Sequence, residues 1–146
     1  MLAVPALEVR RVLPGDMDEV VELEKASFDD PYPRYFLEQL AAAHPDTFLV
    51  ASAEGEILGY TVVDMWEDHD HLISIAVHSE WRRRGIGRRL LLALDAALGN
   101  RRPMRLEVRR SNTEAIQFYL KNGFTKTRTD EGYYQDGEDA LIMERA

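Results

Sequence analysis

Two glycines and a cluster of arginines stand where an apolar run gives way to a helical pattern. The glycines are Gly85 and Gly87, and five arginines surround them within eight residues: Arg82, Arg83, Arg84, Arg88 and Arg89. The first turn of a helix has backbone N–H groups without intrahelical partners and the positive end of the helix dipole, so it can hold an anion. Glycine lets the backbone turn tightly and approach a ligand closely. The segment therefore predicts a phosphate-binding loop.

The flanking residues predict the elements that would position this loop. Residues 72–77 form an apolar run typical of a strand, and apolar side chains then recur at helical spacing from Ile86. The sequence Gly-x-x-x-x-Gly-Lys-Ser/Thr is absent, which disfavours a nucleotide triphosphatase, and Gly-x-Gly-x-x-Gly is absent, which disfavours a dinucleotide fold. The alternative is a solvated arginine cluster at the start of a helix.

Composition narrows the class of protein. With 146 residues, the chain suits one domain with a sizeable core. No N-terminal stretch resembles a signal peptide and no apolar run approaches membrane-spanning length, so we expect a cytoplasmic protein with no membrane partner. The absence of cysteine excludes disulfides, thiolate metal sites and a cysteine nucleophile.

Charge is distributed unevenly along the chain. The formal net charge is −8, yet residues 82–110 hold ten basic residues and only two acids, a local charge of +8 that leaves −16 on the rest. An acidic protein is a poor nonspecific binder of nucleic acid. A basic segment on an acidic body fits a small polyanionic ligand better, although each arginine singly could be a surface residue.

The remaining pattern predicts four helices and seven strands. The helices follow apolar spacing between caps and breakers and cover residues 17–28, 34–43, 86–98 and the segment from a capping box at 111–114 through 121. The strands are apolar or alternating runs between turn residues and cover 7–12, 48–51, 57–65, 72–77, 104–108, 124–129 and 140–143. Asp16 is the predicted N-cap of the first helix. The order β-α-α-β-β-β-α-β-α-β-β predicts an α/β protein with one mixed sheet and helices on both faces.

Several of these motifs resemble one enzyme family. Arg82-x-x-Gly85-x-Gly87, after a strand ending Ile75-Ala76-Val77, resembles the Gln/Arg-x-x-Gly-x-Gly/Ala signature of the GNAT acetyltransferases, whose backbone amides hold the pyrophosphate of acetyl-CoA. The run 105–109, with residues 111–124, is similar to the second half of ribosomal-protein N-terminal acetyltransferases. The more specific motif Tyr133-Tyr134-x-Asp136-Gly137-Glu138-Asp139-Ala140 is similar to archaeal N-terminal acetyltransferases and to the catalytic subunit of the eukaryotic NatA complex.

The resemblance covers nearly the whole chain, so it implies a single N-acetyltransferase domain over residues 1–146. The implied fold is the GNAT fold, with a single mixed, mostly antiparallel sheet and helices on both faces. The implied reaction is transfer of acetyl from acetyl-CoA, as co-substrate and without a metal, to the α-amino group of a protein N-terminus. Since the chain has no cysteine, direct attack in a ternary complex is the simple route.

The resemblance also implies roles for individual residues. Tyr119 matches the position that protonates the departing thiolate, while Glu107 and His71 match positions at which different branches of the family place the base. An α-amino group has a pKa of about 8, so a base must take its proton before attack. The implied acetyl-CoA contacts are Ile75, Ala76, Val77, Arg82, Arg83, Arg84, Gly85, Ile86, Gly87, Arg88, Asn112 and Tyr119. The implied peptide contacts are Asp30, where the family usually has Glu, and Tyr32, Tyr133 and Tyr134.

Each assignment has a structural alternative. Glu107 could be an ion-pair partner of its strand neighbours Arg105 and Arg109, and His71 could be a half-exposed histidine at a strand start. Tyr119 could fill the core with a satisfied hydroxyl. The remaining alternatives are a helix cap for Asn112 and ordinary strand aromatics for Tyr133 and Tyr134.

Three other functions compete with peptide N-terminal acetylation. A GNAT enzyme could act on a free small amine such as a polyamine, a related protein could sense acyl-CoA without catalysis, and the arginines could bind RNA. The last lacks aromatic residues interleaved with the basic ones. We expect protein or peptide N-termini as partners, with ribosomal and nascent chains as candidates, no nucleic acid, and a monomer or weak dimer.

Overall fold

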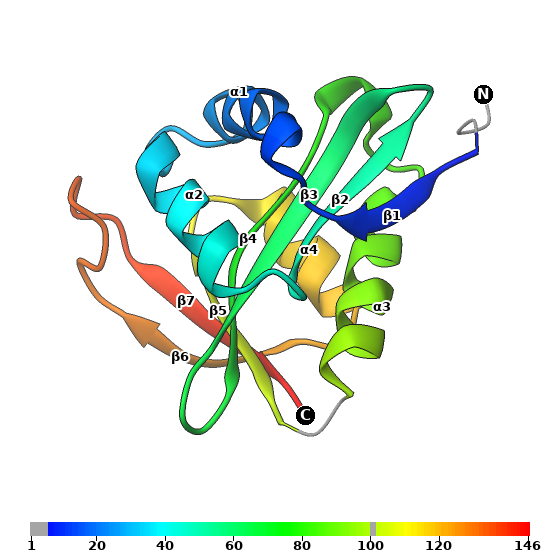
Figure 1. The fold of residues 1–146 in the computed structure, drawn as a ribbon. Helices are drawn as coiled ribbons and strands as arrows, with labels where there is room; N and C mark the ends of the chain where they lie inside the picture. The colour runs from blue at the N-terminus through cyan, green and yellow to red at the C-terminus, as the bar shows by residue number, and fades with distance from the viewer. Residues whose placement is uncertain (1–5, 100–101) are drawn as a thin grey trace. The chain divides into compact units, whose positions relative to one another are not determined.

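The computed structural model describes residues 6–99 and 102–146, whose elements are drawn in Figure 1. Its helices are α1 (Met17–Ser27), α2 (Arg34–Ala43), α3 (Ile86–Leu98) and α4 (Thr113–Lys121), and its strands are β1 (Glu8–Arg11), β2 (Phe48–Ala53), β3 (Glu56–Met65), β4 (Asp70–Val77), β5 (Met104–Arg109), β6 (Thr125–Asp130) and β7 (Ala140–Arg145). Two 3-10 turns, Pro14–Asp16 and Ser79–Trp81, precede α1 and α3. The predicted order of helices and strands is confirmed.

The seven strands form one sheet in the order β1-β2-β3-β4-β5-β7-β6. β4 and β5 are parallel, whereas β1 with β2, β2 with β3, β5 with β7 and β6 with β7 are antiparallel. The predicted mixed, mostly antiparallel sheet is therefore confirmed. By its contacts the chain forms two compact units, one holding residues 6–64 and 73–99 and the other 65–72 and 102–146.

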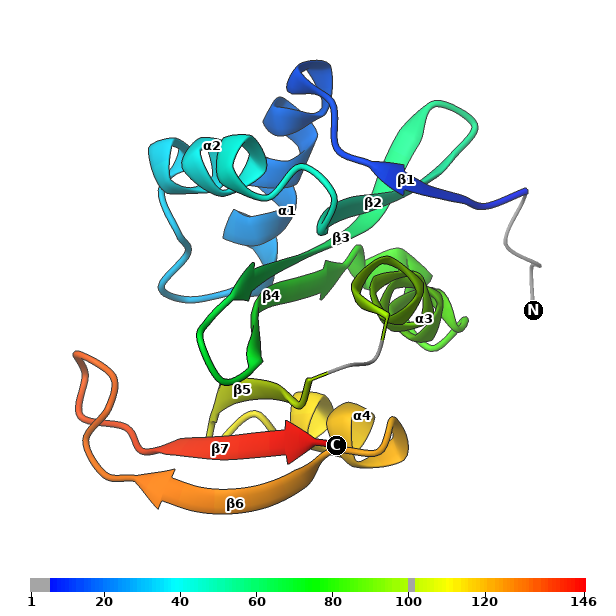
Figure 2. The same cartoon turned by 60° about the horizontal axis from the view of Figure 1, so that its bottom comes forward.

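In the first unit, helices cover both faces of the sheet. Buried side chains of α1 and α2 pack with Phe48 and Val50 of β2 and Tyr60 of β3. Neighbouring residues of a strand point to opposite faces, and a Cβ at Gly59 would lie 3.3 Å from Ile86 and from Leu90 of α3. Figure 2 shows the same arrangement, with α1 and α2 on one side of β2 and β3 and α3 on the other.

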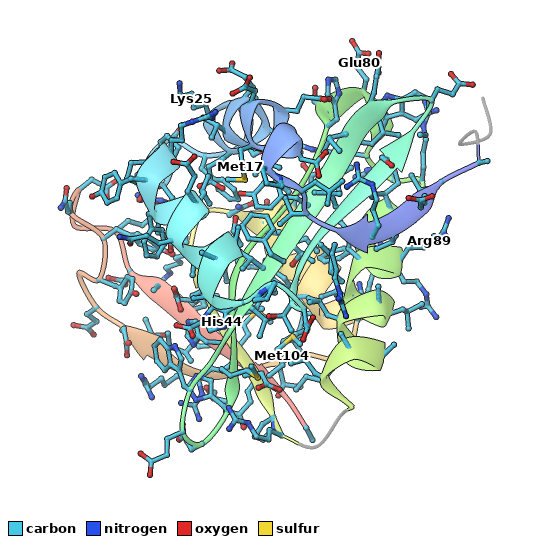
Figure 3. All side chains as sticks on the ribbon, in the orientation of Figure 1. Met17, Lys25, His44, Glu80, Arg89 and Met104 are labelled. Carbon is cyan, nitrogen blue, oxygen red and sulfur yellow. The ribbon has the colours of Figure 1, made fainter. Side chains whose placement is uncertain are left out.

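Helix α1 shows how apolar spacing builds this core. Met17, Val20 and Val21 are buried, which places one stripe of the helix against the strands. Figure 3 shows the same polarity, with Met17 directed toward the strands and Lys25 away from them. The one acidic residue of this stripe, Glu24, is only 1% exposed.

In the second unit, β5 carries the regular alternation that the sequence predicts. Met104, Leu106 and Val108 are buried and the residues between them are half-buried. Leu106 lies opposite Met143 of β7, and Glu107 lies opposite Ile142. The start of β4 runs parallel to β5, with His71 opposite Arg105. This pairing brings the polar residues of β4 and β5 to neighbouring positions.

One predicted helix cap is right in position only, and another is wrong. Asp16 occupies the N-cap position of α1 as predicted, but its side chain makes no cap hydrogen bond, because its oxygens accept from Arg10 at 2.7 and 3.0 Å and from the Leu13 backbone N–H at 2.7 Å. Ser111 does not cap α4, because its backbone N–H donates to Glu138 at 2.8 Å and the helix begins later. The cap is Asn112, whose side chain accepts from Ala115 N–H at 3.2 Å.

Within the described residues, no helix is long and apolar enough to cross a membrane.

Candidate active site

The predicted phosphate loop lies between β4 and α3 in the first unit. Gly85 takes a left-handed conformation, with φ of +82°, at the N-cap position of α3, where a side chain would be strained. Within the described residues, no side chain caps this helix. The first-turn N–H groups therefore have no side-chain acceptor, and the helix N-terminus can accept an anion.

The five arginines of this loop differ in their contacts and exposure. Arg82 donates from Nε to the carbonyl of Val77 at 3.0 Å, which closes the loop onto the end of β4. The Arg84 guanidinium lies 4.9 Å from the Trp81 ring centroid, and Arg89 donates to the Leu7 carbonyl at 3.2 Å. The remaining two, Arg83 and Arg88, are exposed. The cluster is thus partly structural, and its exposed members could meet a polyanion.

Close packing fixes the start of α3 against the end of β4. A Cβ at Gly59 would lie 3.0 Å from the carbonyl oxygen of Ala76 and 3.3 Å from side-chain carbons of α3. The backbone N–H of His78, just after β4, donates to the Leu58 carbonyl at 2.7 Å. Only a glycine permits this approach. Through these contacts β3 holds the end of β4 and the start of α3, which flank the phosphate loop, in place.

The second unit brings His71 and Glu107 together. The His71 Nε2 atom lies 2.6 Å from Glu107 Oε2, and the two side chains are 7% and 16% exposed. The half-exposed alternative for His71 is therefore wrong. The ion pairs of the neighbouring arginines join Arg105 to Glu144 and Arg109 to Asp136 and Glu138, each at 2.9 Å.

The histidine contact continues toward the surface through residues that sequence reasoning missed. His69 Nε2 lies 2.9 Å from His71 Nδ1, and His69 Nδ1 lies 2.7 Å from Asp68 Oδ1. Trp66 stacks on His71, with ring centroids 4.1 Å apart and planes within 9°. The missed signal is the His-x-His spacing at the start of β4, since alternate residues of an extended chain share a face.

Tyr119 lies in α4 with its side chain buried. Burial raises the pKa of its phenol far above the usual range, and the carboxyl of Glu107 adds to this increase. Its ring packs edge-on against Phe124, with centroids 5.6 Å apart. The hydroxyl has no hydrogen-bond partner among residues 6–99 and 102–146, so the alternative of a satisfied core tyrosine is not supported. The group is a protonated donor at neutral pH.

Tyr133, Tyr134 and the acidic residues that follow them lie in a loop, not in a strand. Residues 131–139 connect β6 to β7, so the strand alternative for Tyr133 and Tyr134 is wrong. Arg109 lies 4.0 Å from the centroid of the Tyr134 ring and pairs with the acids that follow it. Bonds from Ser111 and Arg109 lower the pKa of Glu138. Asp136 and Glu138 therefore fix the conformation of this loop, while Tyr133 is 50% exposed.

The other predicted peptide contacts lie in the first unit. Asp30 is exposed, and Tyr32 is half-buried with its ring 4.8 Å from that of Phe36. The backbone N–H of Tyr32 donates at 3.0 Å to the buried carboxyl of Glu24, a residue to which sequence reasoning gave no role.

The predicted site residues are divided between the two units. The first holds Asp30, Tyr32, Ile75, Ala76, Val77 and residues 82–88, and the second holds His71, Glu107, Asn112, Tyr119, Tyr133 and Tyr134. Within the second unit the structure joins His71 to Glu107, and the rings of Tyr133 and Tyr134 meet edge-on with centroids 5.0 Å apart.

Residues 17–124 match the acetyltransferase (GNAT) family. An N-alpha-acetyltransferase of Sulfurisphaera tokodaii is 33% identical over 150 residues, which cover 92% of this chain and 90% of that protein. The crystal structure of Ard1 from Thermoplasma volcanium superposes with a TM-score of 0.90 at 30% identity, covering 96% and 97% of the two chains. Chaetomium thermophilum Naa20, solved in complex with a bisubstrate analogue, superposes with a TM-score of 0.85 at 31% identity, covering 94% and 85%. The chain therefore belongs to the acetyltransferase (GNAT) family.

Proposed function

We propose that this protein transfers the acetyl group of acetyl-CoA to the α-amino group of a protein N-terminus, by direct attack in a ternary complex, within one domain spanning residues 1–146. The observation that carries this proposal is the second unit's catalytic set. It places the His71–Glu107 pair, with His71 buried and Glu107 half-buried, in the same unit as Tyr119, a protonated phenol without a partner among the described residues. These are the base and the acid that acyl transfer between an amine and a thioester needs.

The α-ammonium group of the peptide first loses a proton to the His71–Glu107 pair. The free amine then forms a bond to the thioester carbonyl carbon, and the C–S bond breaks. The departing sulfur carries the electron pair of that bond and takes the hydroxyl proton of Tyr119. The nitrogen, which becomes cationic when it bonds to carbon, loses its extra proton to leave a neutral amide, and the Tyr119 phenolate takes up one proton to restore the phenol. Because burial keeps Tyr119 protonated, the phenol is ready to donate at neutral pH.

The cofactor-binding residues on this proposal are those of the phosphate loop and the end of β4. The open N-terminus of α3 would receive the pyrophosphate, with the exposed Arg83 and Arg88 adding positive charge. Asn112 would reach the pantetheine arm from the start of α4, in addition to capping that helix. The bisubstrate analogue bound to Naa20 supports direct transfer, since such an analogue joins both substrates in one molecule.

The proposed peptide contacts lie in two loops, with Asp30 and Tyr32 in a loop of the first unit and Tyr133 and Tyr134 in a loop of the second. Both loops are anchored by buried or paired carboxyl groups, through Glu24 and Glu138 respectively. We propose ribosomal or nascent chains as the source of the N-terminus and the cytoplasm as its place, with the enzyme acting as a monomer or weak dimer.

The test is acetyl transfer from acetyl-CoA to a panel of peptides with free N-termini. Peptides with a blocked N-terminus and an internal lysine, together with free polyamines, are the controls. We expect acetylation of the free N-termini alone. Turnover of polyamines, with none of the peptides, would instead identify an enzyme for small amines.

The same assay tests the acid. Tyr119→Phe removes one hydroxyl and keeps the ring against Phe124. General acids contribute about 10²–10⁴-fold, so kcat should fall by roughly 10²-fold or more with both KM values little changed. Tyr35→Phe, at a tyrosine 67% exposed, is the matched control. Wild-type kcat in Tyr119→Phe would assign the proton to another donor.

A further inference from the structure

We propose that Asp68 and His69 are positioning residues that join the His71–Glu107 pair into a four-group chain, which gains and loses one shared proton as a unit. This inference rests on the proposed function for its role in catalysis. The chain is defined by Asp68, His69, His71 and Glu107, and all four residues belong to the second unit.

Three consecutive hydrogen-bond distances carry the proposal. They are 2.7 Å from Asp68 Oδ1 to His69 Nδ1, 2.9 Å from His69 Nε2 to His71 Nδ1, and 2.6 Å from His71 Nε2 to Glu107 Oε2. The side chains of His69 and His71 are 1% and 7% exposed, whereas the Asp68 side chain is 73% exposed. The chain therefore runs from solvent through two buried imidazoles to the carboxyl group assigned to the base.

Counting hydrogens shows that one proton is shared. Each of the three contacts needs one hydrogen, and two neutral imidazoles supply one N–H each. With both carboxyl groups ionised, one contact would place two lone pairs face to face at hydrogen-bond distance. A third proton removes this conflict and changes the charge of the four groups from −2 to −1. Groups coupled in this way titrate as a set rather than one by one.

The groups around the chain influence whether it holds the shared proton. Arg102 donates to the His69 carbonyl and pairs with Asp70 at 3.2 Å, and Arg105 contributes positive charge near Asp68. Trp66 covers one face of His71, while the phenols of Tyr119 and Tyr133 lie within the electrostatic reach of Glu107. The two carboxyl groups at the ends favour the shared proton, and these cations oppose it.

The shared proton links the chain to the reaction. In the form without the shared proton, one contact of the chain has no hydrogen. The His71–Glu107 pair can then take a proton from the peptide's α-ammonium group. An N–H bond of the substrate breaks and an N–H or O–H bond of the chain forms. In the form that already holds the shared proton, the pair is a weaker base. The acid limb of kcat/KM should therefore follow the titration of the whole chain.

The first test is an NMR titration of the imidazole nitrogens in the intact protein, without substrate. We expect His69 and His71 to titrate together with one midpoint, taking up one proton between them. Asp68→Asn removes a negative end of the chain, so it should move this midpoint to lower pH by a fraction of a pH unit. Glu67→Gln removes the same charge from the exposed neighbouring residue and should move it less. Independent midpoints, or equal effects of the two variants, would overturn the proposal.

The second test is the pH profile of kcat/KM for a peptide substrate in the same three proteins. The acid limb should move with the NMR midpoint in Asp68→Asn and stay near the wild-type position in Glu67→Gln. A normal acid limb in Asp68→Asn, with peptide acetylation intact, would refute the shared proton and leave the proposed function standing. A joint NMR titration without any peptide acetylation would refute the proposed function and leave the four-group chain standing.

Discussion

Glu24 is a buried carboxyl group on which three donors converge, and Tyr60→Phe tests what they contribute. Its Oε1 accepts from the Tyr60 hydroxyl and from Ser74 Oγ, the latter at 3.1 Å, and its Oε2 accepts from the Tyr32 backbone N–H at 3.0 Å. Burial, together with the nearby carboxyl group of Glu24, raises the pKa of Tyr60, so its hydroxyl remains a donor at neutral pH. Phenylalanine keeps the ring and deletes only this donor.

The magnitude follows from the burial of the site. Glu24 is 1% exposed and Tyr60 is fully buried, so water cannot replace the lost hydroxyl. Loss of one partner from a buried polar group costs about 1–3 kcal/mol of unfolding free energy. For a chain of this length each kcal/mol lowers Tm by about 2–4 °C, so we expect Tyr60→Phe to melt roughly 2–12 °C below the wild type.

The functional consequence passes through Tyr32. The carboxyl group that holds Tyr60 also holds the Tyr32 backbone, which belongs to the proposed peptide loop. A loosened carboxyl should therefore raise the peptide KM by a few-fold and leave CoA affinity unchanged. Substrate positioning that depended on other contacts alone would leave this KM at the wild-type value.

Thermal unfolding followed by circular dichroism measures the stability effect, with Tyr35→Phe as the control at an exposed tyrosine. A double-mutant cycle with Ser74→Ala separates the two hydroxyls, which lie 3.0 Å apart and share one oxygen of Glu24. We expect the two changes to be non-additive. If Tyr60→Phe and Tyr35→Phe had the same Tm, the Tyr60 hydroxyl would contribute nothing to stability, and the argument from burial would be wrong.

Three further changes test the phosphate loop, the packing beneath it and an ion pair. Gly87→Glu puts a negative charge in the first turn of α3, and calorimetry should show roughly tenfold or greater loss of CoA affinity in a folded protein. Gly59→Ala should cost about 1–3 kcal/mol in denaturant unfolding, because its Cβ would lie 3.0 Å from the Ala76 carbonyl oxygen. The hydrogen bond from Arg10 lowers the pKa of Asp16. The resulting stabilisation is present above the unfolded pKa of about 3.9 and is lost as pH falls through the lower folded value, so Asp16→Asn should destabilise at pH 7 but not near pH 2.

Local periodicity predicted the elements because they bury one regular face. α2 spans Arg34–Ala43 as its spacing predicts, and the alternation of β5 matches its burial. β4 was predicted from Leu72 but begins at Asp70, since its first two residues are polar and yet buried. Asp70 pairs with Arg102, and His71 with Glu107, which is 36 residues away in the chain. Such partners compensate burial, and no local window of sequence contains them.

The side-chain caps predicted at Asp16 and Ser111 are absent for a related reason. Asp16 and Ser111 both occupy positions that favour an N-cap, but in each case a tertiary partner takes the group that the cap would use. Arg10 binds the carboxyl group of Asp16, and Glu138 binds the backbone of Ser111. Local cap preferences are worth about 1 kcal/mol, which a charged hydrogen bond can outweigh.

The carboxyl groups of Glu24, which is buried, and Glu107, which is half-buried, show which features of a site the sequence can predict and which it cannot. Glu24 follows Met17, Val20 and Val21 at the spacing of one helical stripe, so the sequence places an acid on the inward face. Burying a polar group is costly unless donors meet it, and that position alone therefore implies partners such as Tyr60. Glu107 carries no such signal, because it alternates with buried residues in the same way as the half-buried arginines on either side of it, Arg105 and Arg109. Its burial follows from the parallel pairing of β4 with β5, which brings His71 to it, and only the assembled sheet contains that information.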